Sequence, residues 1–336
     1  MTETVKLGGF VRRFLLEHLA TDRNLSRNTQ WSYRDTLALF IPFVAKNKHR
    51  HADELSVLDL SPDLLRQFLL DLEKSRRCSI STRNQRLAAI RSLARYIGLQ
   101  NPEYLAWSGE IRAIPFKKFT RAQISYLEKP EMEALLAAPD RETVQGQRDY
   151  RLLLFAYNTG ARASEIAGLH IGDLDLARDP ERTLSSVTFL GKGNKQRRCP
   201  IWPRTVRELV QAIAGRPANQ PVFLNRVGQP ITRFGIHELV KRYVQRVTAD
   251  HPSLRAKRVS PHVIRHTTAT HLLRAGVDIN TIRGWLGHVS LDTTNIYAEI
   301  DLETKARALA LCEVSSEGVQ KRRRSTPSLL SFLNSL

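Results

Sequence analysis

The chain has 336 residues, 42% of them hydrophobic, which is enough for more than one buried core. Its 52 lysines and arginines outnumber 33 acidic residues, and the net charge of +19 favours a polyanionic partner over an indifferent basic surface. No apolar run approaches the roughly 20 residues that span a bilayer, and the first residues do not resemble a secretory signal. We therefore expect a cytoplasmic protein with no membrane partner.

The cysteines argue against disulfides. Cys78, Cys199 and Cys312 are an odd number at wide spacings, and the sequence has no Cys-x-x-Cys pair. This usage is typical of a reducing compartment and does not predict a thiolate zinc site.

Residues 1–108 predict a helical domain. An apolar stripe predicts one helix over residues 29–45. A second begins at Ser61, a typical N-cap that is followed by a proline. A third covers residues 80–98 and is expected to stop at Gly98.

The third predicted helix has a basic face opposite its apolar one. Four arginines at helical spacing form this face, and they are Arg83, Arg86, Arg91 and Arg95. The face fits a row of phosphate contacts and fits a plain solvated surface about equally well.

The periodicity breaks after the helical domain. Residues 109–127 predict an extended linker that is basic at Lys117 and Lys118. Residues 128–312 predict a second, larger domain, in which one helix is capped by Gly160. Residues 313–336 read as a polar, basic tail with a short apolar end.

A β-hairpin is predicted inside the second domain. The passage "RTLSSVTFLGKGNKQRRCPIW" contains two apolar runs on either side of a turn rich in glycine and lysine. Val187 and Phe189 would belong to the first strand, and Cys199, Ile201 and Trp202 to the second. The fold class is therefore mainly α with a small β-sheet.

Two histidines four residues apart, His262 and His266, raise the question of a metal site. Zinc proteases with this spacing have a glutamate after the first histidine, whereas this chain has Val263, and no third ligand follows at a fixed spacing. The segment "GKGNKQ" matches neither a dinucleotide fingerprint nor a phosphate loop. We expect no metal and no nucleotide cofactor.

Phosphodiester chemistry explains the same region better. Two guanidinium groups can clamp both non-bridging oxygens of a phosphate, and Arg162 and Arg265 are candidates for that role. Tyr297 is a candidate nucleophile, and a lysine at the hairpin tip is a candidate general acid.

Taken in order, these motifs form a specific pattern. Gly-Ala-Arg-x-Ser-Glu, a Gly-Lys-Gly-x-Lys hairpin, His-x-x-Arg-His and Leu-Gly-His with a tyrosine nine residues later follow one another along the chain. The pattern resembles the tyrosine recombinases, also called lambda-type phage integrases, and especially their Xer-like branch. The resemblance is strong from residue 129 to residue 310 and looser over residues 5–110.

The resemblance implies a role for each matching residue. Tyr297 would be the nucleophile that forms a 3′-phosphotyrosyl bond, and Arg162 and Arg265 would stabilise the transition state. Lys192 would be the general acid, with Lys195 as the less favoured choice. His262 would be the acid–base partner of the tyrosine, His288 would orient the phosphate or the nucleophile, and Glu165 would support Arg162 from behind.

Other basic residues are expected to bind DNA or to be structural. Lys195, Arg197 and Arg198 on the hairpin are expected to contact phosphates, as are the basic residues of the helical domain and linker. His266 and His271 match no catalytic position and are expected to be structural.

The resemblance also implies an architecture and partners. It predicts a two-domain, C-shaped clamp around double-stranded DNA, a homo-tetramer acting on two recombination sites, and accessory recombination proteins as further partners. The clamp would work on the nucleoid of a prokaryotic cell. Leu329, Leu330, Leu333 and Leu336 would lie on one face of a short tail helix that docks into a neighbouring subunit.

Alternatives of other classes stay open at this point. Charge and a helix-turn-helix interpretation of residues 276–297 fit a sequence-specific DNA-binding regulator. Charge alone fits a structural nucleoid protein. A topoisomerase or hairpin-forming resolvase would share the chemistry, and the sequence does not separate a phage integrase from a transposon recombinase or a chromosome-dimer resolvase.

Overall fold

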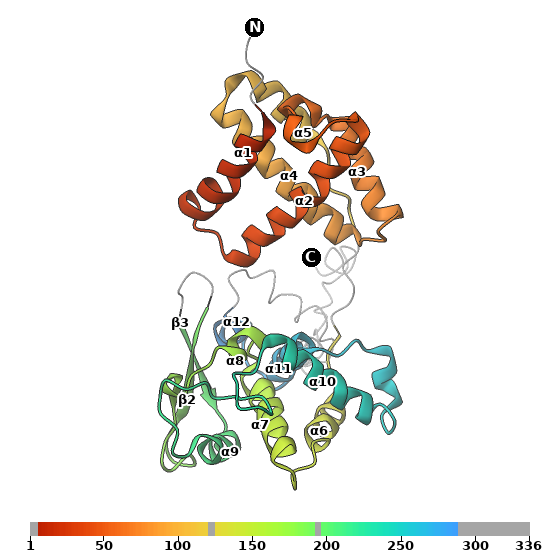
Figure 1. Ribbon diagram of the computed structural model, residues 1–336. Coiled ribbons are helices and arrows are strands. Elements are labelled where there is room, and N and C mark those ends of the chain that lie inside the picture. Colours follow the sequence, from red (N-terminus) through yellow and green to blue (C-terminus); the bar gives the residue numbers. More distant parts are fainter. Residues whose placement is uncertain (1–5, 120–124, 192–195, 288–336) are drawn as a thin grey trace, which may run out of the picture. The chain divides into compact units, whose positions relative to one another are not determined.

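The computed structural model describes residues 6–119, 125–191 and 196–287, and it divides into two compact units (Figure 1). Unit one extends to Ala122 and unit two begins at Gln123. Each has its own hydrophobic core, and no residue is shared between the two cores. No helix of the described residues is long and apolar enough to cross a membrane.

Unit one is helical throughout its described part, as predicted. In chain order it contains α1 (Leu7–Arg13), a π-helical segment (Phe14–Asp22), α2 (Arg27–Lys48), α3 (Pro62–Lys74), α4 (Ile80–Gln100) and α5 (Leu105–Ala113), with short 3₁₀ turns at Ala52–Glu54, Val57–Asp59 and Pro102–Tyr104. Ser61 caps α3 as expected, because its hydroxyl accepts a hydrogen bond from the Leu64 amide at 3.3 Å.

Two boundaries in unit one differ from the sequence prediction. Helix α4 does not stop at Gly98 but continues to Gln100. Gly98 is needed for packing instead, since a Cβ atom there would lie 2.8 Å from the Ser108 Cβ on α5. Helix α5 occupies the first residues of the predicted linker, and Ile114 after it is still buried in the core of unit one.

The segment after α5 is fastened to α4. The Asn84 side chain donates to the Lys117 carbonyl at 2.8 Å and accepts from the Lys117 amide at 3.1 Å. Arg83 donates to the Pro115 carbonyl at 3.1 Å. The predicted linker is therefore held against unit one up to Lys117.

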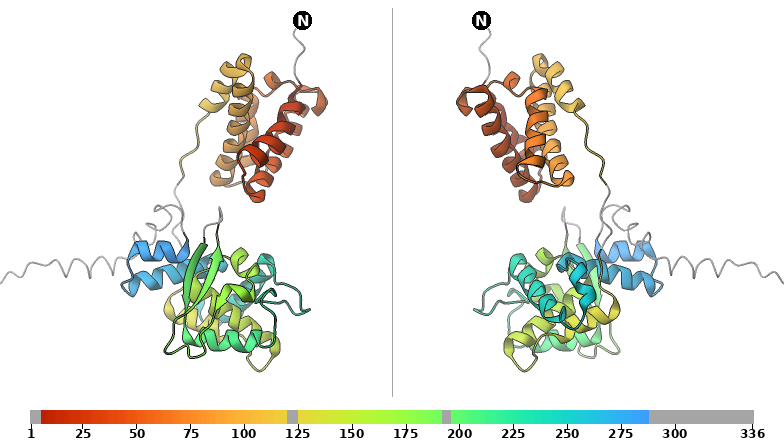
Figure 2. Two further views of the ribbon diagram at one scale, coloured as in Figure 1. Left: turned by 90° about the vertical axis from the view of Figure 1, so that its left-hand side faces the viewer. Right: turned by 90° about the vertical axis from the view of Figure 1, so that its right-hand side faces the viewer.

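Unit two combines helices with a small sheet (Figure 2). Its elements are α6 (Lys129–Ala137), α7 (Val144–Thr159), α8 (Ala163–Ala167), β1 (Leu174–Asp175), β2 (Ser185–Leu190), β3 (Gln196–Ile201), α9 (Pro203–Ile213), α10 (Arg233–Val247), α11 (Pro261–Arg274) and α12 (Ile279–Leu286), with 3₁₀ turns at Ile171–Asp173 and Pro252–Ala256. The mainly helical fold class with a small sheet is confirmed.

The sheet is antiparallel with the order β1-β2-β3, and it contains the predicted hairpin. Val187 faces Cys199 and Phe189 faces Arg197 across the hairpin. Val187, Phe189, Cys199 and Ile201 are buried, as their alternation predicts. Trp202 is not part of the strand: it precedes α9, and its amide donates to the Asn158 side chain at 2.8 Å.

The long helices of unit two are joined by buried polar contacts as well as by the core. Asp149 on α7 is fully buried and accepts hydrogen bonds from Tyr243 at 2.9 Å and Arg242 at 2.8 Å, both on α10. The Thr268 hydroxyl on α11 donates to the Tyr157 carbonyl on α7 at 2.7 Å. Helix α7 is thus fixed on two sides, and its carboxyl end carries the turn that leads to Arg162.

Candidate active site

The turn between α7 and α8 forms the base of the site. Gly160 ends α7 in the left-handed conformation with φ of 60°, a backbone state that favours glycine. Arg162 follows as the N-cap residue of α8, and its amide donates to the Glu165 carboxylate at 2.7 Å. The same carboxylate accepts a hydrogen bond from the Arg162 guanidinium at 2.8 Å.

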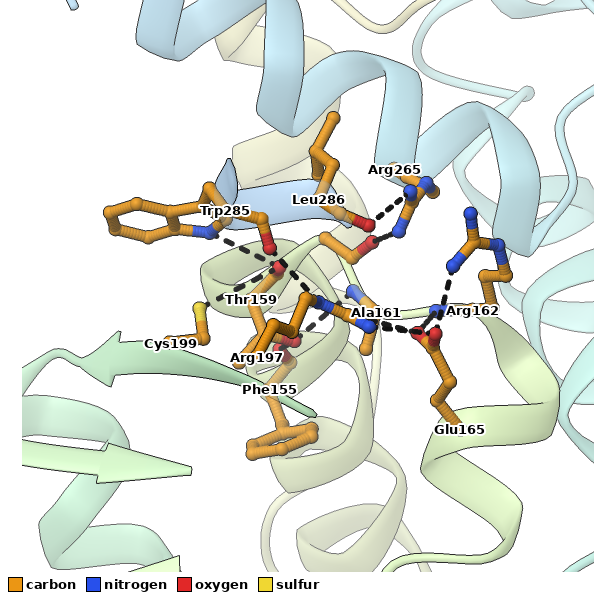
Figure 3. A network of polar contacts seen from close by, with 11 residues as sticks. Phe155, Thr159, Ala161, Arg162, Glu165, Arg197, Cys199, Arg265, Trp285 and Leu286 are labelled. Carbon is orange, nitrogen blue, oxygen red and sulfur yellow. Dashed lines mark hydrogen bonds and ion pairs between the residues drawn. The ribbon is translucent and has the colours of Figure 1, made fainter. Parts of the chain in front are cut away.

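Arg265 joins this turn to the end of α12. Its side chain is only 1% exposed, and its guanidinium donates to the Gly160 carbonyl at 2.8 Å and to the Leu286 carbonyl at 2.6 Å (Figure 3). One buried cation therefore bridges two segments that are more than a hundred residues apart in the sequence. Arginine suits this position because its planar fork can donate in two directions while it stays charged.

His262 lies one turn before Arg265 on α11. The pKa of His262 is lowered from its ordinary value, first by partial removal from water and then by the positive charges of Arg265 and Arg162. His262 is therefore mainly neutral at pH 7, the state in which an imidazole can accept a proton. Arg265, one turn further along α11, is hydrogen-bonded to the Gly160 carbonyl, two residues before Arg162, so His262 lies on the helix that contacts the turn of Arg162.

His266 packs against His262, with 4.4 Å between the ring centroids in an edge-to-face arrangement. Burial, His262 and Arg265 together lower the pKa of His266 to about 4. Its expected structural role stays a prediction. His271, the third histidine of the cluster, lies elsewhere on α11 and its Nδ1 forms a hydrogen bond with the Tyr157 hydroxyl at 2.7 Å.

Glu165 lies between two arginines. Burial alone would raise its pKa, but hydrogen bonds and charge from Arg197, followed by those from Arg162, lower the pKa to about 2. Arg197 donates to both carboxylate oxygens, at 2.8 and 2.7 Å. The carboxylate is therefore ionised throughout the neutral pH range, and it fixes the Arg162 guanidinium.

Two of the predicted phosphate contacts, Arg197 and Arg83, are buried beside carboxylates. The Arg197 side chain is only 8% exposed and bonded to Glu165, so its guanidinium belongs to the interior. Arg83 is 6% exposed, lies beside Glu73 on α3 and donates to the Pro115 carbonyl. Burial leaves both charges paired with carboxylates rather than facing solvent, which favours a structural role, and their predicted contact with phosphates stays untested.

Other predicted site residues are untested. Lys192, Lys195, His288 and Tyr297 lie outside the described residues, as do Cys312 and the leucines of the tail. Lys117 forms an ion pair with Glu73 at 2.7 Å and is 44% exposed. Lys118 is exposed and Arg86 is half-buried, so a DNA-binding role for these three residues stays a prediction. Within the described ranges, no group of three or more potential metal ligands converges.

Sequence reasoning missed the internal role of Arg197, although a signal for it existed. Cys199 and Ile201 point into the core, and Arg197 has the same parity along β3, whereas Arg198 has the opposite one. The bonds that Arg197 and Arg265 make to the end of α12 could not be found from residue types, because they are accepted by the backbone carbonyls of Trp285 and Leu286.

Comparisons with known proteins fit this arrangement. The model of the "Phage integrase family" matches residues 125–303, and that of the "Phage integrase, N-terminal SAM-like domain" matches residues 12–100. The chain is 38% identical over 338 residues to the putative integrase/recombinase y4rC of Sinorhizobium fredii, covering 100% of both chains. It is 34% identical to the tyrosine recombinase XerC of Pelobacter propionicus, covering 94% of this chain and 97% of the relative.

Solved structures share the fold. The XerH site-specific recombinase bound to a palindromic difH substrate has a TM-score of 0.65 at 22% identity, covering 87% of this chain and 82% of that one. The Tn1549 transposon integrase in complex with circular intermediate DNA has a TM-score of 0.64 at 19% identity, covering 90% and 99%. The matched models and the relatives together show that this chain belongs to the phage integrase family of tyrosine site-specific recombinases.

Proposed function

We propose that the chain cuts and rejoins double-stranded DNA at specific sites, with Tyr297 as the nucleophile. The observation that carries the proposal is the hydrogen bond from Arg265 to the Gly160 carbonyl, which joins the helix of His262 and Arg265 to the turn that carries Arg162, about a hundred residues earlier in the sequence. Two fixed cations beside a neutral imidazole are suited to a phosphodiester that gains negative charge during transfer.

The proposed reaction needs no net energy input. The Tyr297 oxygen attacks phosphorus and His262 takes the phenolic proton, while the bond to the 5′ oxygen breaks and Lys192 protonates that oxygen. The new phosphotyrosyl bond replaces one phosphodiester bond with another ester. A 5′-hydroxyl of a second strand can then reverse the step, so rejoining requires no ATP.

Arg162 and Arg265 would carry the electrostatic part of catalysis, the task that metal ions perform in many nucleases. His288 would orient the phosphate or the nucleophile by a hydrogen bond. In the sequence, Lys192 falls between β2 and β3, and His288 follows Gly287, the residue after α12.

DNA as the substrate is supported by the net charge of +19 and by the solved relatives, which are complexes with a difH substrate and with circular intermediate DNA. We propose that the two units form a clamp on the duplex. Four copies would act together on two sites with accessory proteins, on the nucleoid in the cytoplasm.

Residues 325–336 would join neighbouring copies. Deleting them is expected to weaken the higher-order DNA complexes in gel shifts more than the single-site complexes, and unchanged higher-order complexes would contradict the docking role.

A suicide substrate tests the chemistry. A nicked duplex site loses the short 5′-hydroxyl fragment after cleavage, so a covalent protein–DNA adduct accumulates. We expect the wild-type chain to form the adduct and Tyr297→Phe to bind the same DNA without forming it. An adduct with Tyr297→Phe would show that another residue is the nucleophile. Binding by the wild type with no adduct on any genomic fragment would favour the alternative, a DNA-binding regulator.

A further inference from the structure

Arg197 contacts several elements of the site. Its Nε donates to the Trp285 carbonyl on α12 at 3.0 Å, and its two terminal nitrogens donate to the two oxygens of Glu165 (Figure 3). Its guanidinium carbon lies 4.5 Å from the centre of the Phe189 ring on β2. One side chain thus joins β2, β3, α8 and α12.

These contacts connect Arg197 to several residues of the proposed chemistry. Through Glu165 it reaches the guanidinium of Arg162. Its own backbone lies two residues after the hairpin tip that contains Lys192 and Lys195. It also packs against the backbone at the end of α12, since a Cβ atom on Gly287 would lie 2.9 Å from the Arg197 Cδ.

We propose that Arg197 is the positioning residue of the active site. It does not touch DNA. It keeps Glu165 ionised and in place, and Glu165 in turn fixes the position of Arg162 relative to the hairpin and the end of α12. The proposal rests on the proposed function, because the phosphate role of Arg162 is part of it. A buried carboxylate that accepts two parallel hydrogen bonds from arginine has a defined orientation, which a lysine could not impose.

Arg198 provides a matched control. It is the next residue on the same strand, with the same charge, but it points outward: its side chain is 66% exposed and it pairs with Asp175, which is also exposed. A general effect of removing positive charge from β3 would appear in both Arg197→Met and Arg198→Met. An effect through Glu165 would appear only in the first.

The experiment measures single-turnover adduct formation on the suicide substrate at saturating DNA, together with DNA affinity. We expect Arg197→Met to slow adduct formation roughly 10- to 100-fold, the usual effect of losing a partner that orients a site residue. The DNA affinity of Arg197→Met should change less than about threefold. Arg198 is itself an expected phosphate contact, so Arg198→Met is expected to weaken DNA binding, but at saturating DNA its rate should stay within about threefold of wild type, as expected for an exposed pair.

The pH profile separates positioning from a loss of general structure. Without Arg197 the burial of Glu165 is less opposed, so its pKa rises from about 2. Protonation then removes the ion pair with Arg162 as the pH falls. The rate of Arg197→Met relative to wild type should therefore decline between pH 7 and pH 5, whereas the ratio for Arg198→Met stays constant. Arg197→Lys keeps the charge and should recover part of the rate.

A double-mutant cycle checks the route through Glu165. In a Glu165→Gln background, Arg197→Met should slow adduct formation much less than it does in the wild-type background, because the side chain at position 165 is already neutral. If Arg197→Met does not fold, Arg197→Lys is compared with Arg198→Lys instead of the two methionine variants.

Two outcomes would overturn the proposal while wild-type adduct formation leaves the proposed function intact. In the first, the Arg197 variants cleave like the Arg198 variants. In the second, Arg197→Met weakens binding and lowers the salt dependence of affinity by about one phosphate contact, which would make Arg197 a DNA ligand after all. A wild-type chain that forms no adduct would instead count against the proposed function itself.

Discussion

The two arginines proposed to bind the phosphate differ in what they do for the fold. Arg265 is buried and bridges the carbonyls of Gly160 and Leu286, so the chain path itself depends on its fork of donors. Arg162 is 40% exposed and bonds to one carboxylate. The same chemical group therefore serves as a structural tie at one position and as a surface clamp at the other.

Replacing each arginine by lysine should separate these roles. Arg265→Lys cannot reach both carbonyls and should lower the free energy of unfolding by roughly 3 kcal/mol, whereas Arg162→Lys should cost less than about 1 kcal/mol. Both should slow adduct formation by roughly 10²- to 10³-fold, by analogy with the loss of one oxyanion donor. Urea unfolding and the suicide substrate measure the two effects; equal stability losses would contradict the distinction.

The lowered pKa of His262 predicts a pH dependence. A histidine with a lowered pKa stays neutral down to a pH below its ordinary value of 6.5, so the neutral base persists through the neutral range. Adduct formation should be level from pH 8 to pH 6.5 and fall only below pH 6.5, as His262 becomes protonated. NMR titration of the imidazole in the free protein checks the pKa directly, and a midpoint above 6.5 would contradict it.

At the scale of elements, the site depends on how closely the α7–α8 turn approaches α12. Gly160 has positive φ, and a Cβ atom there would lie 2.7 Å from the Leu286 Cδ2 and 3.3 Å from the Thr268 Cγ2. Position 160 therefore requires glycine for two reasons: the backbone has positive φ, and there is no room for a Cβ atom. The close approach is what brings the Gly160 and Leu286 carbonyls within reach of one guanidinium.

Gly160→Ala should lower the free energy of unfolding more than Gly215→Ala does. Gly215 also has positive φ, but no atom lies within 4 Å of its Cβ position. We expect about 1–2 kcal/mol at Gly215 from backbone strain alone and roughly 2–4 kcal/mol at Gly160, where overpacking against Leu286 adds to it. Urea unfolding gives both values. If the two variants were equally stable, the turn and α12 would not be in the tight contact described.

The secondary-structure elements could be predicted from the sequence better than the ion pairs between arginines and carboxylates could. Periodicity and capping residues located α3, α4, α7 and the hairpin, because each depends on neighbours within a few positions. The end of α4 was missed, since Gly98 is explained by packing on α5 rather than by helix termination. Motif order identified Arg162 and Arg265, but composition could not tell that Arg197 and Arg83 are buried beside carboxylates, because burial is set by tertiary contacts.

At the scale of the whole molecule, the segment between the two units is fixed at each end. On one side the Asn84 side chain holds Lys117; on the other, Arg274 donates to the Tyr126 hydroxyl at 2.8 Å and to Glu128 at 2.7 Å. The Leu127 amide also donates to the Thr267 hydroxyl at 2.9 Å. Each unit thus includes its own end of the linker in its hydrogen-bonded structure.

Separate cores predict separate folding. Unit one buries its own aromatic cluster and satisfies a buried indole, since Trp107 donates to the Leu60 carbonyl at 2.9 Å. A polypeptide of residues 1–119 should therefore fold alone and show a helical circular dichroism spectrum. The full chain should unfold in two thermal transitions, and the melting temperature of the isolated polypeptide should match one of them. Replacing Trp107 by phenylalanine should lower that transition and leave the other unchanged, because the two cores share no residue. A single transition in the full chain that Trp107→Phe shifts as a whole would mean that the units fold as one.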